Sequence, residues 1–169
     1  MKETVKVLNQ MVKRGVIQKY AIGGAIGAIY YLEPFETSDL DVFVQINLEG
    51  STLTILAPIY DYLGESGYEA QAEFVNIEGV PVQFLPSYSP LIDEAIEKAK
   101  MVKFDRVQTR VLRPEHLVAI MIDTGRPKDY LRISMFIEQG AVKMSSLQPV
   151  LRRHNLLEKW KMNAQRFTT

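Results

Sequence analysis

Apolar residues in the first segment of the chain recur at the spacing of an amphipathic helix. Val5, Leu8 and Met11 fall on one helical face, and Gly15 follows them. This pattern predicts a helix over residues 3–14 that ends near the glycine.

A short apolar run at residues 20–22 leads into Gly23 and Gly24. This pattern predicts a buried strand followed by a tight turn, and then a helix over residues 25–32 that ends before a proline. The run of β-branched and aromatic residues at 39–46 predicts the clearest strand in the chain.

The middle of the chain alternates between predicted helices and strands. Residues 52–65 have the pattern of a helix. Residues 69–77 and 80–85 alternate around a Glu-Gly pair, which predicts a β-hairpin. A proline opens a predicted helix over residues 90–100, and residues 106–112 can form one more short strand.

The rest of the chain is predicted to be helical. Pro114 and Pro127 each suit the first position of a helix, and Gly125 suits the end of the first of these two helices. Ser145 or Ser146 can cap a third helix.

The order of these elements predicts an α/β (α+β) fold. Residues 1–112 would form a core with a small mixed sheet and flanking helices, and residues 113–169 a C-terminal helical segment packed on it. The chain has 169 residues, of which 47% are hydrophobic. That is enough for one compact unit with its own core.

Composition excludes several kinds of site. The chain has no cysteine, so neither a disulfide nor a thiolate site can form, and this composition fits a cytoplasmic location. No apolar stretch approaches the ~18 residues that cross a bilayer, and charges are spread through the N-terminal residues. We therefore expect no membrane association and no signal peptide.

The formal net charge of zero hides an asymmetry between the two parts of the chain. Residues 1–100 hold 7 basic and 14 acidic side chains, whereas residues 101–169 hold 13 basic and 6 acidic ones. An acidic part joined to a basic part suits a site where carboxylates hold a metal and cations meet phosphates. Helical faces with different solvated charges would explain the asymmetry equally well.

Asp39 and Asp41 lie two residues apart at the start of a predicted strand. Because side chains alternate between the faces of a strand, both carboxylates point the same way and Leu40 points into the opposite layer. Two adjacent carboxylates repel each other, and a cation such as Mg²⁺, which prefers oxygen ligands, would neutralise them. Alone, the pattern also fits two exposed acids beside a turn.

Gly23 and Gly24 lie between a predicted strand and a predicted helix. Glycines at such a corner let backbone N–H groups approach an anion, although a tight turn without a ligand has the same pattern. A dinucleotide-binding fold does not fit, because the glycines read G-G-x-x-G rather than G-x-G-x-x-G. The two acids also lie where the next strand begins, whereas a ribose-binding acid comes at its end.

Residues 20–46 combine these features in one order: apolar strand, glycine pair, helix, then Thr-x-Asp-x-Asp at the start of a second apolar strand. This combination resembles the DNA polymerase beta-like nucleotidyltransferase superfamily. The closest similarity is to its minimal bacterial members, including those of type IV toxin–antitoxin systems. The segment 125–129, G-R-P-K-D, also resembles the R-x-K-D helix start of such proteins.

The resemblance implies transfer of a nucleoside monophosphate from a nucleoside triphosphate (NTP) to an acceptor hydroxyl, with release of pyrophosphate. Asp39 and Asp41 would be the catalytic pair and would hold two Mg²⁺ ions that stabilise the attacking and leaving oxygens. The acceptor could be RNA, a protein hydroxyl or a small molecule, and an antitoxin-like partner protein is a further expectation. The residues expected to contact the nucleotide are Gly23, Gly24, Thr37, Ser38, Arg126 and Lys128.

Two positions depart from the superfamily pattern. The third carboxylate, expected on a later strand, is replaced by Gln83, which can offer a carbonyl oxygen to a metal but cannot take a proton. The arginine expected four residues before the first aspartate is replaced by Phe35. Either Glu73, on the partner strand of the hairpin, supplies the missing base, or the domain is a degenerate member that binds nucleotide or a partner without catalysis.

Other residues carry weaker signals. His116 and His154 have no neighbouring ligand pattern, so we expect them at the surface or at helix caps rather than on a metal. The basic residues around Trp160 could contact nucleic acid, because cations bind phosphates and aromatic rings stack on bases. A solvated helix face that packs Trp160 on the core explains them as well.

Overall fold

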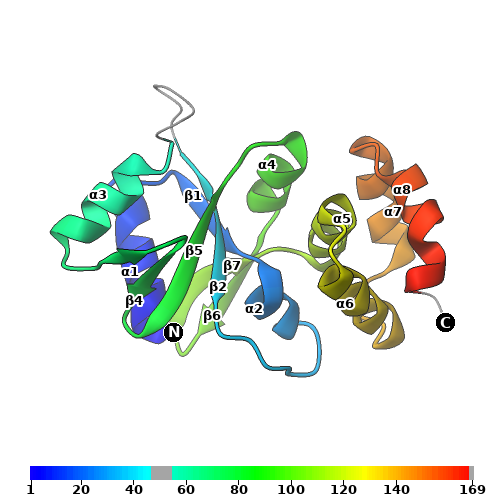
Figure 1. The fold of residues 1–169 in the computed structure, drawn as a ribbon, viewed down its shortest axis with the longest axis horizontal. Helices are drawn as coiled ribbons and strands as arrows, with labels where there is room; N and C mark the ends of the chain where they lie inside the picture. The colour runs from blue at the N-terminus through cyan, green and yellow to red at the C-terminus, as the bar shows by residue number, and fades with distance from the viewer. Residues whose placement is uncertain (47–54, 168–169) are drawn as a thin grey trace.

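The computed structural model describes residues 1–46 and 55–167. They form a seven-stranded mixed sheet with helices on both faces, in the strand order β3-β4-β5-β2-β1-β7-β6 (Figure 1). The strands are β1 (Lys19–Ile22), β2 (Leu40–Gln45), β3 (Ala70–Gln71), β4 (Phe74–Ile77), β5 (Val80–Pro86), β6 (Lys100–Phe104) and β7 (Val107–Val111). The helices are α1 (Lys2–Lys13), α2 (Gly24–Ile29), α3 (Ala57–Glu65), α4 (Pro90–Glu97), α5 (Pro114–Thr124), α6 (Pro127–Glu138), α7 (Met144–Arg153) and α8 (Leu157–Asn163), followed by the 3₁₀ turn η2 (Ala164–Arg166).

Strand β2 lies in the middle of the sheet and carries the predicted acids at its start. It pairs antiparallel with β1 and parallel with β5. Along β2, Leu40 belongs to the apolar cluster on one face, whereas Phe43 belongs to the cluster on the other face. The alternation of a strand therefore places Asp41 on the face of Phe43, opposite to Leu40, as the sequence predicted.

Helices α1 and α3 cover one face of the sheet, on the left in Figure 1. The predicted helical stripe of α1, Val5, Leu8 and Met11, is fully buried. Ile59 and Leu63 of α3 join the same cluster. This layer supports the side of the sheet away from the predicted acids.

Helices α2 and α4 cover the other face, and α5, α6, α7 and α8 form a helical layer beyond them (Figure 1). Ala21 and Phe43 contribute to this second core from the sheet. Phe136 of α6 and Leu151 of α7, both fully buried, belong to the same cluster. One core thus continues from the sheet into the C-terminal helices.

Glu94 of α4 connects this sheet-covering helix to the helical layer. Its carboxylate accepts hydrogen bonds from Arg153, at the end of α7, and contacts Nε2 of His154 at 2.7 Å. Nε2 of His116 in α5 lies 3.2 Å from the same carboxylate. His116 is only 1% exposed, so the expectation of a surface or cap position is wrong for this histidine.

The structure confirms the predicted fold class, with a mixed sheet, flanking helices and a helical C-terminal part. The helix predicted over residues 90–100 ends at Glu97, because Lys100 begins β6, a strand that the sequence did not predict. Helix α7 begins at Met144 after Lys143, so the expected serine cap is wrong. Part of the helix predicted over residues 52–65 lies outside the described residues.

The predicted hairpin around Glu78 and Gly79 is present as β4 and β5. A second turn splits the first arm into β3 and β4, which the alternation of residues did not reveal. None of the helices in the described part of the chain is long and apolar enough to cross a membrane.

Candidate active site

A cavity of about 220 Å³ lies between the acidic end of β2 and the α5–α6 corner. One part of its wall is polar and includes two carboxylates, an amide and two guanidinium groups, whereas the other part is apolar. The lining residues are Gly24, Asp41, Phe43, Gln83, Leu85, Tyr88, Leu117, Ile120, Met121, Thr124, Arg126, Asp129 and Arg132.

The sheet register places Asp41 beside Gln83. The two residues are partners on the neighbouring parallel strands β2 and β5. Partners on adjacent strands point to the same face of a sheet, and both residues line the cavity. The position at which the sequence pattern has a third carboxylate is therefore next to the half-buried Asp41, and it carries an amide.

The glycine pair forms the corner between β1 and α2, and each glycine is packed against a β2 side chain. A Cβ on Gly23 would lie 2.4 Å from the ring of Phe43, and a Cβ on Gly24 would lie 1.7 Å from Oδ2 of Asp41. Gly24 also has a φ of +54°, a conformation that glycine adopts without steric cost. Only glycines fit here.

The backbone N–H of Gly23 is already engaged, because it donates to the carbonyl oxygen of Asp41 at 3.0 Å. The sequence assigned this glycine to the triphosphate. Its observed contacts fix the β1–α2 corner against β2, and its role at the triphosphate stays a prediction. Gly24 lines the cavity and leaves the Asp41 carboxylate uncovered on that side.

The second wall begins where α5 ends. Gly125 adopts a φ of +70° and closes α5, and Pro127 opens α6. The side chain of Asp129, fully buried, accepts hydrogen bonds from the backbone N–H and the guanidinium of Arg126. The guanidinium is held at the cavity edge by this buried carboxylate, which also raises the pKa of Arg126.

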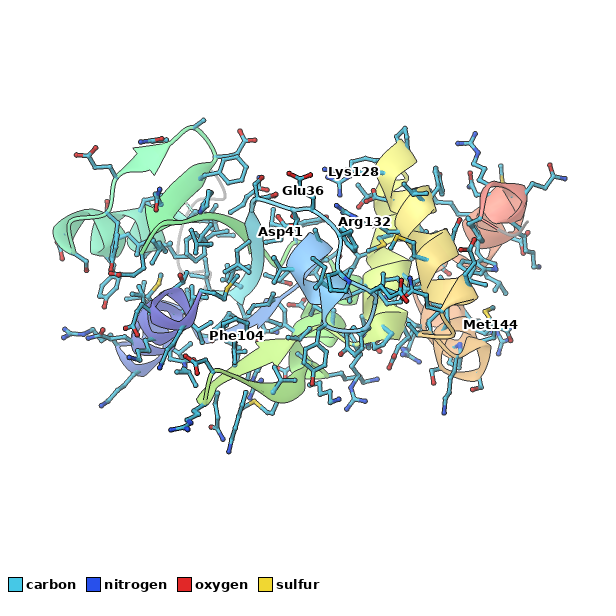
Figure 2. The ribbon with its side chains drawn as sticks, turned by 90° about the horizontal axis from the view of Figure 1, so that it is seen from below. Glu36, Asp41, Phe104, Lys128, Arg132 and Met144 are labelled. Atoms are coloured by element: carbon cyan, nitrogen blue, oxygen red, sulfur yellow. The ribbon has the colours of Figure 1, made fainter. Side chains whose placement is uncertain are left out.

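Three basic residues, the N-cap of α6 and two residues within the helix, act electrostatically on the acids at the start of β2. Burial is the largest cause of a raised pKa at the Asp41 carboxyl, and the negative charge of Asp39 raises the pKa further. The positive charges of Arg126, Arg132 and Lys128 oppose this rise. Figure 2 shows Lys128 and Arg132 projecting from α6 toward the segment that carries Asp41.

Arg132 is a cavity residue that the sequence analysis missed. It lies one helical turn after Lys128, and its guanidinium carbon is 5.6 Å from the centre of the Phe35 ring. Phe35 occupies the position at which the superfamily pattern has an arginine. The guanidinium of Arg132, from α6, therefore lies over the residue that replaces this arginine. Arg132 follows Lys128 by four residues, a spacing that places both side chains on one face of a helix, and this spacing could have identified Arg132 from the sequence.

Asp39 lies on the same sheet face as Asp41 but lines a neighbouring shallow hollow. The hollow is formed by the segment before β2 and by β3, β4 and β5, and contains Ser38, Asp39, Gln71, Phe74, Asn76 and Pro81. The structure therefore places Ser38 beside Asp39 in this hollow. Thr37 is half-buried beside it and lines neither space.

Glu73 does not join the acids. It lies exposed in the turn between β3 and β4 and lines neither the cavity nor the hollow. Within residues 1–46 and 55–167 there is no cluster of three or more acidic, histidine or cysteine side chains suited to a metal. The Asp129 carboxylate is bound to Arg126, so the carboxylate and amide oxygens that remain for a metal here are those of Asp39, Asp41 and Gln83.

Tyr88 is a second cavity residue that the sequence analysis missed. It follows β5 and is 71% exposed, although it lines the cavity. Leu117, Ile120 and Met121 of α5 form the apolar part of the same cavity. The periodicity of α5 predicted apolar residues, but it could not show which of them would remain open to a cavity.

A solved structure of similar fold is the crystal structure of an antigenic nucleotidyltransferase-like protein from Paracoccidioides brasiliensis. The TM-score is 0.56 at 16% sequence identity, and the match covers 98% of this chain and 92% of that chain. No protein-family model matches the chain, and no curated protein matches its sequence. The chain has a nucleotidyltransferase-like fold.

Proposed function

We propose that this nucleotidyltransferase-like chain binds a nucleoside triphosphate with Mg²⁺ and transfers the nucleoside monophosphate to an acceptor hydroxyl. The observation that carries the proposal is that Asp41 lines one cavity with Arg126 and Arg132. The positive charge of Lys128 also acts on the Asp41 carboxyl. A triphosphate bound with Mg²⁺ presents both signs of charge, so it is complementary to an acidic and a basic wall.

The donor set fits Mg²⁺. Asp39 and Asp41 repel each other, and Gln83 adds a carbonyl oxygen beside Asp41. Mg²⁺ takes oxygen ligands and is usually held by one or two carboxylates together with substrate phosphates. The residues present suit one such ion, while a second would lack the charge of a third carboxylate. When bound, Mg²⁺ would neutralise the phosphates and polarise them toward attack.

The reaction balances as a single displacement at phosphorus. The acceptor oxygen forms a bond to the α-phosphorus, the bond from that phosphorus to the β-bridging oxygen breaks, and pyrophosphate leaves. Arg126 and Arg132 would stabilise the charge that develops on the leaving phosphates. Gln83 cannot take the proton of the acceptor hydroxyl, so in this proposal that proton is lost to water.

The apolar part of the cavity suits the base of the nucleotide. Tyr88 presents an aromatic ring at the cavity mouth, and Ile120 and Met121 present apolar surface from α5. Aromatic rings stack on bases with little regard to base identity. This arrangement supports binding of a purine or pyrimidine ring next to the phosphates.

The proposal is tested with NTPs labelled at the α-phosphate. We expect label transfer to an acceptor in a cell extract only with Mg²⁺, and we expect Asp41→Asn to abolish both transfer and Mg²⁺-dependent NTP binding. Lys143→Gln, at an exposed position directly before α7 that does not line the cavity, should change neither. NTP binding that is absent in the natural protein, or unchanged in Asp41→Asn, would refute the proposal.

A second candidate function is nucleotide binding without transfer, and the register pairing of Gln83 with Asp41 favours it. A degenerate site would bind NTP through the same cations but would transfer no label. Gain of transfer in Gln83→Asp, in a protein that is otherwise inactive, would establish this second function.

A further inference from the structure

Strands β6 and β7 form a hairpin at the edge of the sheet, away from the candidate active site. Within the described part of the chain, β6 pairs with β7 and no other strand covers its outer edge. Figure 2 shows Phe104, at the end of β6, on the side of the molecule opposite to Lys128. The backbone N–H and C=O groups along this edge are open to a ligand.

The net charge of the hairpin is positive, whereas the net charge of the chain before it is negative. Residues 1–99 hold 6 basic and 14 acidic side chains, whereas residues 100–113 hold 5 basic and 1 acidic one. The single acid, Asp105, is neutralised by Lys2 at 3.0 Å. Lys103 and Arg106 are exposed and make no ion pair with any described residue. The hairpin therefore presents uncompensated positive charge.

Apolar side chains lie exposed among these cations. Met101 is 52% exposed and Phe104 is 46% exposed. Tyr30, at the end of α2, is also 46% exposed, and Nζ of Lys100 lies 5.3 Å from the centre of its ring. Lysines alone are a common protection of an edge strand, but exposed aromatic rings are not. The combination instead matches surfaces on which cations bind phosphates and rings stack on bases.

In the turn of the hairpin, the backbone of a basic residue adopts a conformation that glycine usually occupies. Asp105 and Arg106 have φ values of +45° and +69°. Two-residue turns with both φ values positive strongly favour Asn-Gly or Asp-Gly. Backbone strain of this kind is concentrated at functional sites. An arginine at the second turn position thus carries a steric cost that a glycine would avoid, and it presents its guanidinium at the tip.

We propose that the edge of β6 and the β6–β7 turn bind single-stranded RNA. Lys103 and Arg110, on one face of the hairpin, and Arg106 at its tip would contact phosphates, while Phe104, on the other face, and Tyr30 would stack on bases across the open edge. The open backbone edge of β6 offers donors and acceptors to ribose 2′-hydroxyl groups, which distinguish RNA from DNA. This surface is separate from the cavity, and the proposal does not depend on the proposed transferase activity.

The helical layer offers a weaker alternative surface for RNA. Its cations are mostly engaged: Arg153 binds Glu94, Lys161 binds Glu158, and Lys159 donates to the carbonyl oxygen of Asp123. Trp160 is 9% exposed and packs against Phe167. The core-packing account of Trp160 that the sequence left open is therefore the one that the structure supports.

Binding is measured by fluorescence anisotropy with a labelled single-stranded RNA of about 12 nucleotides. We expect affinity to fall steeply between about 50 and 200 mM salt. The double variant Lys103→Gln/Arg106→Gln should bind about tenfold more weakly or worse, with a log–log salt slope that is shallower by about 1.4. The matched double variant Lys143→Gln/Arg152→Gln, on the helical layer, should bind like the natural protein.

Two further variants separate binding from folding. Arg106→Gly relieves the turn, so it should unfold at the same or a higher temperature than the natural protein and still bind RNA more weakly. Phe104→Ala should weaken binding at least about fivefold and leave the salt slope unchanged, because it removes stacking and no charge.

Several outcomes would overturn the proposal. Unchanged RNA affinity in Lys103→Gln/Arg106→Gln, or loss of affinity in the helical-layer control, would show that RNA does not bind at the β6–β7 hairpin. DNA of the same sequence bound as tightly as RNA would remove the role of the 2′-hydroxyl. Binding to anionic lipid vesicles but not to RNA would assign the edge to a membrane surface, and a dimer in light scattering that Lys103→Gln changes would assign it to a second copy of the chain.

Discussion

Asp41 of β2 and Gln83 of β5 are register partners on adjacent parallel strands, and their side chains share the face of the sheet that lines the cavity. Neighbouring strands lie about 4.8 Å apart, so an oxygen at position 83 can reach the same cation as the Asp41 carboxylate. An amide at this position gives a neutral oxygen ligand, whereas an aspartate would give a charged one. This pairing determines how much charge the site offers to Mg²⁺.

Gln83→Asp should therefore tighten Mg²⁺ binding. A carboxylate beside Asp41 adds a negative ligand, and we expect Mg²⁺ affinity to rise at least about tenfold, measured by calorimetry with and without NTP. Without Mg²⁺ the variant should unfold at a lower temperature than the natural protein, because like charges face each other across the strands. Gln83→Asn, which keeps an uncharged amide, is the control. Equal Mg²⁺ affinity in the two variants would show that position 83 does not contact the ion.

Gly24→Ala should destabilise the fold and remove NTP binding. The new Cβ would overlap the Asp41 carboxylate, and the positive φ of Gly24 disfavours alanine. We expect a loss of at least about 1 kcal/mol in the free energy of unfolding, measured by urea denaturation. Gly64→Ala is the matched control: Gly64 lies exposed within α3 with nothing near its Cβ position. That variant should gain about 0.5–1 kcal/mol. A Gly24→Ala protein as stable as the natural one would contradict the close packing of this corner.

The sequence predicted the acidic half of the candidate site because its signal is local. The glycine pair and Asp39-Leu40-Asp41 lie within one strand–helix–strand segment, so alternation and turn chemistry were enough to place them. The fold class followed from the same order of elements. Whether these residues bind nucleotide stays a prediction.

The sequence could not show which later residues meet this segment. Tyr88, between β5 and α4, and Arg132 of α6 line the same cavity through tertiary packing, which no local pattern encodes. Strand β6 was hidden because its lysines, Lys100 and Lys103, lower strand propensity, and its pairing with β7 outweighs that preference. The turn at Asp105 and Arg106 lacks a glycine, so turn chemistry gave no signal for the hairpin either.

Tyr88→Ala should weaken NTP binding without weakening tripolyphosphate binding. The ring lies at the cavity mouth, so its removal affects contact with the base and leaves the cations in place. We expect the affinity for ATP to fall at least about fivefold, measured by calorimetry in Mg²⁺, and Tyr88→Phe to keep it. Because Tyr88 is 71% exposed, the unfolding temperature should not change. Equal losses for ATP and tripolyphosphate would mean that Tyr88 does not contact the base.

Glu94→Gln tests the connection between α4 and the helical layer through its dependence on pH. Hydrogen bonds from Arg153, Lys98 and the histidines lower the pKa of Glu94 well below its ordinary value. A carboxylate with a lowered pKa stabilises the folded state above the unfolded pKa of about 4.3, and this contribution is lost as the pH falls.

At pH 7 we therefore expect Glu94→Gln to lower the free energy of unfolding by about 1–3 kcal/mol, because the charged guanidinium of Arg153 then donates to a neutral amide instead of a carboxylate. The difference from the natural protein should shrink steadily as the pH falls below about 4.3, in urea denaturation at each pH. Glu97→Gln on the same helix removes an exposed ion pair with Lys19 and should have little effect. If the Glu94 difference did not depend on pH, the loss would come from packing, and the carboxylate would not be the group that joins the helices.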